Sequence, residues 1–197
     1  MQQYVGAHAL LRLRLGEFTG QPAWNLRFSN DEYGKPTLDD RDGSVAFSLS
    51  HTRGMVAIAI SAGGAVGVDV EATDRRISDE AAIVSAYFTP DEAAAFERAP
   101  EGPARKSLFV HMWTRKEAVL KAAGRGLGLP LSEFSVAGDN DWTEIPFIRA
   151  EAPFGFALAS RSFGAFQVAI AVRLTGQARP SFLWREEAQD IFPRQGY

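Results

Sequence analysis

Met-Val-Ala-Ile-Ala-Ile at residues 55–60 is a short, wholly apolar run, with Arg-Gly directly before it and a glycine-rich turn at residues 62–64 after it. Such a run between chain-breaking residues is typical of a buried β-strand. Residues 45–49 precede it across a polar turn at residues 50–54, and residues 65–71 follow it. We therefore expect three strands, at residues 45–49, 55–60 and 65–71, in an antiparallel meander.

The same apolar pattern returns near the C-terminus. Val-Ala-Ile-Ala-Ile at residues 56–60 is echoed by Val-Ala-Ile-Ala-Val at residues 168–172, and each copy follows a strand-like segment and a polar turn. An internal repeat of this kind indicates a duplicated α+β unit whose two halves pack together. The alternative is that two buried strands simply share an apolar composition.

Helical segments accompany these strands. The clearest helix start is Thr89-Pro90-Asp91-Glu92, where Thr89 suits the N-cap, Pro90 the first turn and Glu92 the third position after the cap. We expect helices at residues 4–18, 79–87, 90–98 and 104–123, the last of which ends at Gly124. Further strands are expected around residues 134–136, 143–149, 155–159 and 166–174, whereas residues 176–197 carry no strong signal.

The composition excludes several kinds of protein. The 197 residues contain no cysteine, which excludes disulfides, thiolate metal ligands and cysteine nucleophiles. The formal net charge is −3 and the basic residues are scattered, whereas a nucleic-acid-binding protein is usually basic. No apolar run approaches the roughly 18 residues of a membrane span. No signal-peptide pattern opens the chain, so we expect a soluble, cytoplasmic protein.

Gly-Val-Asp-Val-Glu at residues 67–71 is the first candidate for chemistry. Side chains on a strand alternate between its faces, so Asp69 and Glu71 point the same way, opposite to the two valines. Two carboxylates on one face repel each other unless a cation lies between them, and Mg²⁺ prefers such oxygen ligands. The alternative is an ordinary strand with one solvated acidic face.

Trp-Thr-Arg-Lys-Glu-Ala-Val-Leu-Lys at residues 113–121 is the second candidate. Positions four apart stack on one side of a helix, so Trp113, Glu117 and Lys121 form one stripe. Taken alone, the spacing of Glu117 and Lys121 favours an ordinary surface ion pair. The following Gly-Arg-Gly-Leu-Gly (residues 124–128) lacks the spacing of a Walker loop or of a dinucleotide fingerprint.

Ser50 and His51 lie at the junction of a strand and a turn. A hydroxyl and an imidazole there could contact a phosphate or stack on a base, and the alternative is a turn histidine without a task. A serine hydrolase is disfavoured, because no Gly-x-Ser-x-Gly elbow exists and adjacent residues are poorly placed as a nucleophile and its base.

Five segments in this order resemble the signature segments of the Sfp-type 4′-phosphopantetheinyl transferases. They are Glu-Tyr-Gly-Lys-Pro (32–36), Ser-Leu-Ser-His-Thr (48–52), Gly-Val-Asp-Val-Glu (67–71), Phe-Thr-Pro-Asp-Glu (88–92) and the run from Trp113 through Gly-Arg-Gly-Leu (113–127). The resemblance covers roughly residues 5–172. It implies an α+β pseudo-dimer of two similar halves, residues 1–64 without the usual first strand and residues 65–197 with the metal site.

The resemblance also implies a reaction and a site. Phosphopantetheine would move from coenzyme A (CoA) to a serine of an acidic apo carrier protein (acyl, peptidyl or aryl), with release of 3′,5′-ADP. The ion would be Mg²⁺, or Mn²⁺ in its place, and the protein would act as a monomer without nucleic acid or membrane. The implied residues are the metal ligands Asp69, Glu71 and Glu117, the catalytic residues Glu117 (as general base) and Lys121, and the CoA contacts Lys35, Ser50, His51 and Lys121.

Some features depart from the family pattern. Larger members carry a further segment before the helix expected near Tyr4, so we expect either weakened CoA binding, with Arg12 as a compensating contact, or a natural start further upstream. Two rival interpretations remain: a non-catalytic homologue that binds CoA or the carrier, and an unrelated metal-dependent phosphohydrolase. Four arginines near the motifs are a candidate docking patch for an acidic carrier: Arg75, Arg76, Arg115 and Arg125.

Overall fold

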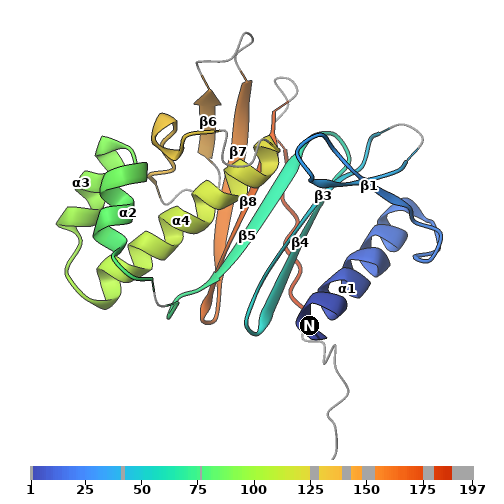
Figure 1. Ribbon diagram of the computed structural model, residues 1–197, viewed down its shortest axis with the longest axis horizontal. Coiled ribbons are helices and arrows are strands. Elements are labelled where there is room, and N and C mark those ends of the chain that lie inside the picture. Colours follow the sequence, from blue (N-terminus) through green and yellow to red (C-terminus); the bar gives the residue numbers. More distant parts are fainter. Residues whose placement is uncertain are drawn as a thin grey trace, which may run out of the picture.

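The computed structural model describes residues 2–40, 43–75, 77–124, 129–138, 143–147, 154–174 and 180–187. Within them the chain is a mixed α+β structure with antiparallel sheets (Figure 1). The helices are α1 (Gln2–Thr19), α2 (Glu80–Tyr87), α3 (Pro90–Arg98), α4 (Pro103–Ala123) and the 3₁₀ turn η2 (Leu131–Glu133). The strands are β1 (Phe28–Asn30), β2 (Pro36–Leu38), β3 (Ala46–Thr52), β4 (Met55–Ser61), β5 (Val66–Ala72), β6 (Thr143–Phe147), β7 (Phe154–Phe163) and β8 (Phe166–Arg173).

The largest sheet has the strand order β5-β8-β7-β6, and every neighbouring pair in it is antiparallel. Its register places Val68 opposite Ile170 and Asp69 opposite Ala169. α4 crosses this sheet, and α2 and α3 lie at the end of the molecule away from α1 (Figure 1). The four predicted helices are thus confirmed to within two residues at each end, because their periodicity and end signals are local features of the chain.

The predicted meander is wrong in its last step. β3 and β4 form a hairpin closed at Arg53-Gly54, where Gly54 adopts a φ of 92° that a residue with a side chain rarely tolerates. β5, however, pairs with β8 rather than with β4. The valines of β5 share an apolar cluster with Val168, so this pairing buries apolar side chains from distant parts of the chain. A local pattern cannot specify such a partner.

The strand predicted around residues 134–136 is also absent from the described secondary structure. Its backbone groups are bonded by side chains instead of by a neighbouring strand. The Val136 N–H donates to Glu92 Oε1 (2.6 Å), Arg115 Nε donates to Val136 O (3.0 Å) and Lys116 Nζ donates to Phe134 O (2.8 Å). The short β1–β2 hairpin, in contrast, was not predicted, because its strands have only three residues each.

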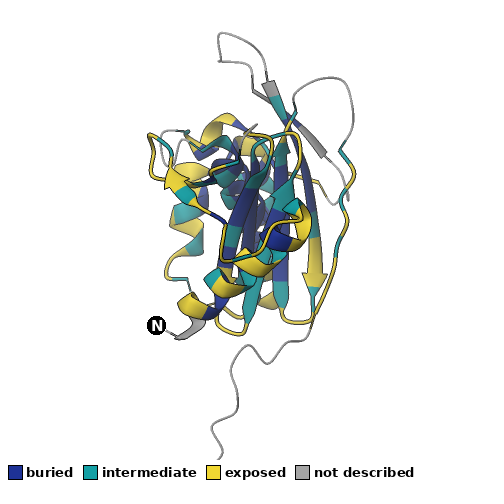
Figure 2. Ribbon diagram, turned by 90° about the vertical axis from the view of Figure 1, so that its right-hand side faces the viewer, coloured by how far each residue is buried: buried dark blue, intermediate teal, exposed yellow. Residues whose placement is uncertain are grey.

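Three apolar clusters hold these elements together, and Figure 2 shows buried positions concentrated along the strands. The first joins α2, α3 and α4 to β7 and β8. The second joins α1 to β1, β2 and the β3–β4 hairpin. The third contains Ala59 of β4, the valines of β5 and Val168 of β8, and Trp184 packs against it. This third cluster contains side chains of both the β3–β4 hairpin and the β5-β8-β7-β6 sheet. The two sheets therefore share a core.

The echo between residues 56–60 and 168–172 corresponds to equivalent strands. β4 and β8 are each the second strand of an antiparallel hairpin, with β3 and β7 as the first strands. A pseudo-dimer with its boundary near residue 64 stays a prediction. In the described part of the chain, no helix has the length and apolar character needed to cross a membrane.

Candidate active site

The site begins with an unusually close contact between α4 and β5. A Cβ added at Gly67 would lie 2.1 Å from Ala118 O and 2.3 Å from Ala122 N, which are backbone atoms of the helix. Only glycine allows this approach. Because residues 67, 69 and 71 share one face of the strand, the contact brings Asp69 to the helix that carries Glu117 and Lys121.

Asp69 is the buried centre of the site, with 5% of its surface exposed. Its Oδ1 accepts hydrogen bonds from Lys121 Nζ (2.7 Å) and from Ser50 Oγ (2.9 Å). Lys121 Nζ also donates to Ser50 Oγ (3.0 Å). Asp69 Oδ2 is buried and has no hydrogen-bond partner among the described residues. An unbonded oxygen on a buried carboxylate is costly, which suits a position that receives a cation.

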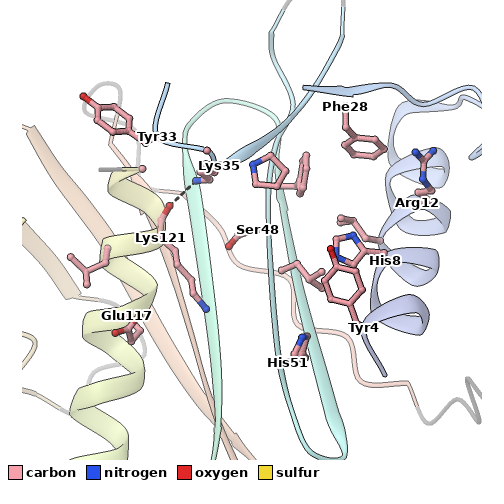
Figure 3. Close-up of a pocket in the computed structure, with 17 residues that line it drawn as sticks. Tyr4, His8, Arg12, Phe28, Tyr33, Lys35, Ser48, His51, Glu117 and Lys121 are labelled. Atoms are coloured by element: carbon pink, nitrogen blue, oxygen red, sulfur yellow. Dashed lines mark hydrogen bonds between the residues drawn. The ribbon is translucent and has the colours of Figure 1, made fainter. Parts of the chain in front are cut away.

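Glu117 lies one helical turn before Lys121, and both side chains line the same cavity (Figure 3). Burial raises the pKa of Glu117, and the negative charge of Asp69 raises this pKa further, against the opposing effects of Lys121 and Arg75. The pKa therefore reports that two carboxylates repel each other here. A divalent ion would relieve this repulsion.

Glu71 is held differently, by an ion pair with the exposed Arg75 four residues later. Among the described residues, no three histidine, aspartate or glutamate side chains are gathered closely enough to hold a metal ion. The donor chemistry of Asp69 and Glu117 nevertheless fits a divalent cation: an unbonded buried oxygen and a second, repelled carboxylate. Arg75 occupies Glu71 Oε1, so Oε2 is the oxygen through which Glu71 would join them as a third ligand.

A cavity of about 820 Å³ opens beside these acids. α1, the β1–β2 hairpin, β3 and α4 each contribute to its wall (Figure 3). Five of the predicted site residues line it: Arg12, Lys35, His51, Glu117 and Lys121. Asp69, Glu71 and Ser50 are not among the lining residues, and Asp69 and Ser50 are buried next to Lys121.

Lys35 links the cavity wall to the elements that carry the acids. Its Nζ donates to Lys121 O (2.6 Å), near the C-terminal end of α4, and to Val66 O (3.0 Å) at the start of β5. Burial lowers the pKa of Lys35, although the nearby carboxylate of Asp31 opposes this effect. In this arrangement Lys35 joins the β1–β2 hairpin to α4 and β5, and its predicted contact with CoA stays a prediction.

Arg12 also has a structural task at the cavity wall. Its Nη1 donates to Ala23 O (3.1 Å) and Leu26 O (3.0 Å), and its guanidinium lies 4.7 Å from the centre of the Phe28 ring. These contacts fix the segment between α1 and β1. A compensating contact with CoA stays a prediction.

Ser50 and His51 lie on β3, which continues to Thr52, and not at a strand end as predicted. Neighbouring strand residues point to opposite faces, so Ser50 faces Asp69 while the exposed His51 faces the cavity (Figure 3). Ser48, on the Ser50 face, was missed. Its Oγ accepts from the Val68 N–H (3.1 Å), and the alternation Ser-Leu-Ser could have indicated this pair.

The predicted docking patch needs correction at Arg115, which is completely buried and donates to Ser160 Oγ (2.8 Å). It cannot meet a partner protein. Arg75 is exposed but paired with Glu71, and Arg76 and Arg125 lie outside the described residues, as does the glycine-rich stretch 125–128. Trp113, the first member of the predicted stripe, stacks on Phe109 and belongs to the core rather than to the cavity.

A second buried cation was also missed. Lys116 Nζ forms an ion pair with Glu92 Oε2 (2.8 Å), and both side chains are fully buried. Lys116 Nζ also donates to Leu131 O (2.7 Å), and Glu92 Oε2 accepts from the Thr89 N–H (2.9 Å). Glu92 was predicted only as a helix cap. The pair fixes the α3–α4 side of the molecule and lies outside the cavity.

Comparison of the sequence with known proteins identifies the family of this chain. The profile of the 4′-phosphopantetheinyl transferase superfamily matches residues 65–172, more than half of the chain. Curated relatives include 4′-phosphopantetheinyl transferase HetI of Nostoc sp. strain PCC 7120, 30% identical over 138 residues, and 4′-phosphopantetheinyl transferase Sfp of Bacillus subtilis strain 168, 36% identical over 112 residues. A third, 4′-phosphopantetheinyl transferase gsp of Aneurinibacillus migulanus, is 30% identical over 136 residues.

These alignments cover 69%, 57% and 69% of this chain but 57%, 47% and 54% of the respective relatives. The chain thus spans about half the length of the curated relatives it matches. The matched segment nevertheless contains four of the predicted site residues, which lie on β5 and α4: Asp69, Glu71, Glu117 and Lys121. The chain therefore belongs to the 4′-phosphopantetheinyl transferase superfamily.

Proposed function

We propose that the protein transfers the phosphopantetheine arm of CoA to a serine hydroxyl of an apo carrier protein and releases 3′,5′-ADP. One observation carries the proposal: Lys121 is bonded to the buried Asp69, and Glu117 lies beside them at the wall of a large cavity. The volume of about 820 Å³ is within the usual range of small-molecule sites. Family membership supports the same reaction.

The cavity suits a diphosphate-containing ligand. Cationic or hydrogen-bonding groups line its wall from α4, β3, α1 and the β1–β2 hairpin. They are the side chains of Lys121, His51, Arg12 and Lys35. Tyr4, Phe28 and Leu49 add aromatic and apolar surface, against which a nucleotide base can pack. We propose that the nucleotide end of CoA lies in this cavity, with its diphosphate toward α4.

The roles of the acids follow from their charges. Asp69 and Glu117, together with Glu71 from the same strand face as Asp69, would hold Mg²⁺ or Mn²⁺, which supplies charge neutralisation for the diphosphate. Glu117 has a raised pKa and faces the cavity, so it is suited to accept the proton of the carrier serine. Lys121 stabilises the negative charge of the departing 3′,5′-ADP as a point charge. The nucleophile belongs to the carrier.

Mass spectrometry of the carrier tests this proposal directly. The protein is incubated with CoA, Mg²⁺ and an apo carrier protein, and a parallel sample contains EDTA. We expect the carrier to gain the mass of one phosphopantetheine group only when Mg²⁺ is present. Binding of CoA without modification of the carrier would support a non-catalytic homologue, and breakdown of CoA without transfer would support a phosphohydrolase.

The choice of carrier is a separate question. One relative, 35% identical over 127 residues, is named L-aminoadipate-semialdehyde dehydrogenase-phosphopantetheinyl transferase, in Eremothecium gossypii. The assay therefore uses acyl, peptidyl and aryl carriers together with a dehydrogenase-type carrier domain. We also propose that the carrier is acidic and that the enzyme acts as a monomer in the cytoplasm.

A further inference from the structure

Ser50 lies on β3 and faces β5, the strand that carries Asp69. β3 runs beside β5, yet no backbone ladder joins the two strands in the described structure. Two buried serines of β3 reach across instead: Ser48 Oγ accepts from the Val68 N–H, and Ser50 Oγ donates to Asp69 Oδ1. Of these two serines, Ser50 is the one that reaches an acidic side chain of the site.

The Ser50 hydroxyl uses both of its hydrogen-bonding roles. A hydroxyl has one proton to donate and lone pairs that accept. Ser50 donates to Asp69 Oδ1 (2.9 Å) and accepts from Lys121 Nζ (3.0 Å), while Lys121 Nζ donates to the same Asp69 oxygen (2.7 Å). The three groups form a closed triangle. It occupies Oδ1 twice, so Oδ2 is the oxygen left for a further ligand.

We propose that Ser50 is a positioning residue that orients the Asp69 carboxylate toward a divalent cation and holds Lys121 beside it. The inference rests on the proposed function for the identity of the ligands. It assigns Ser50 a task different from the nucleotide contact that the family resemblance implies. A hydroxyl bonded to a ligating carboxylate restricts the rotation of that carboxylate, and removing such a partner typically weakens metal binding or activity by about 10–100-fold.

The first measurement is metal affinity, which needs no carrier protein. Mn²⁺ is titrated into the full chain with and without CoA, free Mn²⁺ is followed by electron paramagnetic resonance, and Mg²⁺ competition gives the affinity for Mg²⁺. We expect Ser50→Ala to bind Mn²⁺ at least about 10-fold more weakly than the wild type. Ser50→Thr keeps a hydroxyl in a strand position that threonine favours, and it should recover most of the affinity.

Ser48→Ala is the matched control for metal binding in the titrations without CoA, because Ser48 also lines the cavity proposed for the nucleotide. Ser48 lies two residues away on the same face and is equally buried, but it bonds to a backbone N–H instead of to Asp69. Both alanine variants should lower the unfolding temperature, whereas only Ser50→Ala should weaken Mn²⁺ binding. If the two variants weaken Mn²⁺ binding equally, or neither does, Ser50 has no positioning role.

The second measurement separates positioning from a direct contact with CoA. At Mg²⁺ concentrations that saturate both proteins, a positioning role predicts that Ser50→Ala lowers kcat while KM for CoA changes little. A raised KM for CoA with unchanged Mn²⁺ affinity would overturn the inference in favour of nucleotide contact.

If the wild type binds Mn²⁺ more tightly than Ser50→Ala but modifies no carrier, the proposed function fails and the positioning role stands. If the wild type modifies the carrier but binds Mn²⁺ no more tightly than Ser50→Ala, the positioning role fails and the proposed function stands.

Discussion

Glu117 combines burial with a charged neighbour, and both effects raise its pKa. In the proposed reaction this side chain accepts the proton of the carrier serine. Positioned general bases typically contribute about 10²–10⁴-fold to the rate, so Glu117→Gln should lower transfer by at least that range. The amide has nearly the same shape and no charge, so the fold should persist. Carrier mass spectrometry measures transfer, and circular dichroism follows unfolding.

Glu101→Gln is the matched control, because Glu101 is a highly exposed glutamate before α4 and lies outside the cavity. It should transfer phosphopantetheine at the wild-type rate. Full activity in Glu117→Gln would remove Glu117 from the mechanism.

The raised pKa of Glu117 also predicts a pH dependence of stability in the absence of divalent ions. The native state binds this proton more tightly than the unfolded chain, in which the pKa has its ordinary value. Between the ordinary and the raised pKa, the unfolding free energy contributed by Glu117 therefore falls as pH rises. In urea unfolding with EDTA between about pH 4 and 7, the unfolding free energy of the wild type minus that of Glu117→Gln should fall as pH rises. Parallel curves for the two proteins would contradict this interpretation.

At the scale of elements, the contact between α4 and β5 decides whether the acids meet. A methyl group at Gly67 would overlap backbone atoms of Ala118 and Ala122, which cannot move aside as a flexible side chain can. We expect Gly67→Ala to push the helix away, to lower the unfolding free energy by about 3 kcal/mol and to abolish transfer. Chemical denaturation and the carrier assay measure the two effects.

Gly63→Ala is the control for this substitution, because a Cβ at Gly63 meets no atom within 4 Å. It should leave both stability and transfer close to the wild type. A Gly67→Ala protein with wild-type stability would show that the helix does not need this close approach.

The buried ion pair between Lys116 and Glu92 joins α3 to α4, and it is a second feature at this scale. Replacing one partner leaves the other charge buried and unpaired, which typically costs about 3–5 kcal/mol. Lys116→Met and Glu92→Gln should each lower the unfolding free energy by about that amount, measured by urea denaturation. The double variant should cost less than the sum of the two single variants, because no unpaired charge remains. Simple additivity would mean that the two side chains are not coupled.

At the scale of the whole molecule, residues 180–187 contact both the large sheet and α1. Trp184 packs against the apolar cluster shared by β4, β5 and β8, and Arg161 lies 5.5 Å from the centre of its ring. Glu187 forms an ion pair with Arg14 of α1. The segment therefore ties α1 to the large sheet, although its sequence carried no recognisable signal.

Trp184→Ala should lower the unfolding free energy by about 2 kcal/mol, because a large, partly buried apolar side chain is lost. Leu183→Ala is the matched control, since Leu183 is 79% exposed and should contribute little. Thermal unfolding of the two variants makes the comparison. Equal effects at residues 183 and 184 would mean that Trp184 does not hold the segment in place.

The described elements show which features are readable from the sequence. The helix ends at residues 90 and 124 were predictable, because capping residues and a terminal glycine act on their own segment. The pairing of β5 with β8 and the side-chain bonding of residues 134–136 were not. Both depend on partners that are distant in the sequence, and several apolar strands could have filled the place of β8.

By itself, the amino-acid sequence determined the helices, most of the strands, the family and the side chains able to do chemistry, because periodicity, caps and motifs are carried by neighbouring residues. The tertiary structure alone decided which groups meet: Lys121 and Ser50 on Asp69, Arg75 on Glu71, Lys35 on the end of α4, and Arg115 in the core. The physical reason is that charges and hydrogen bonds act over a few ångströms in space, and the distances between these groups are fixed by packing of the whole chain around Gly67 and the shared core.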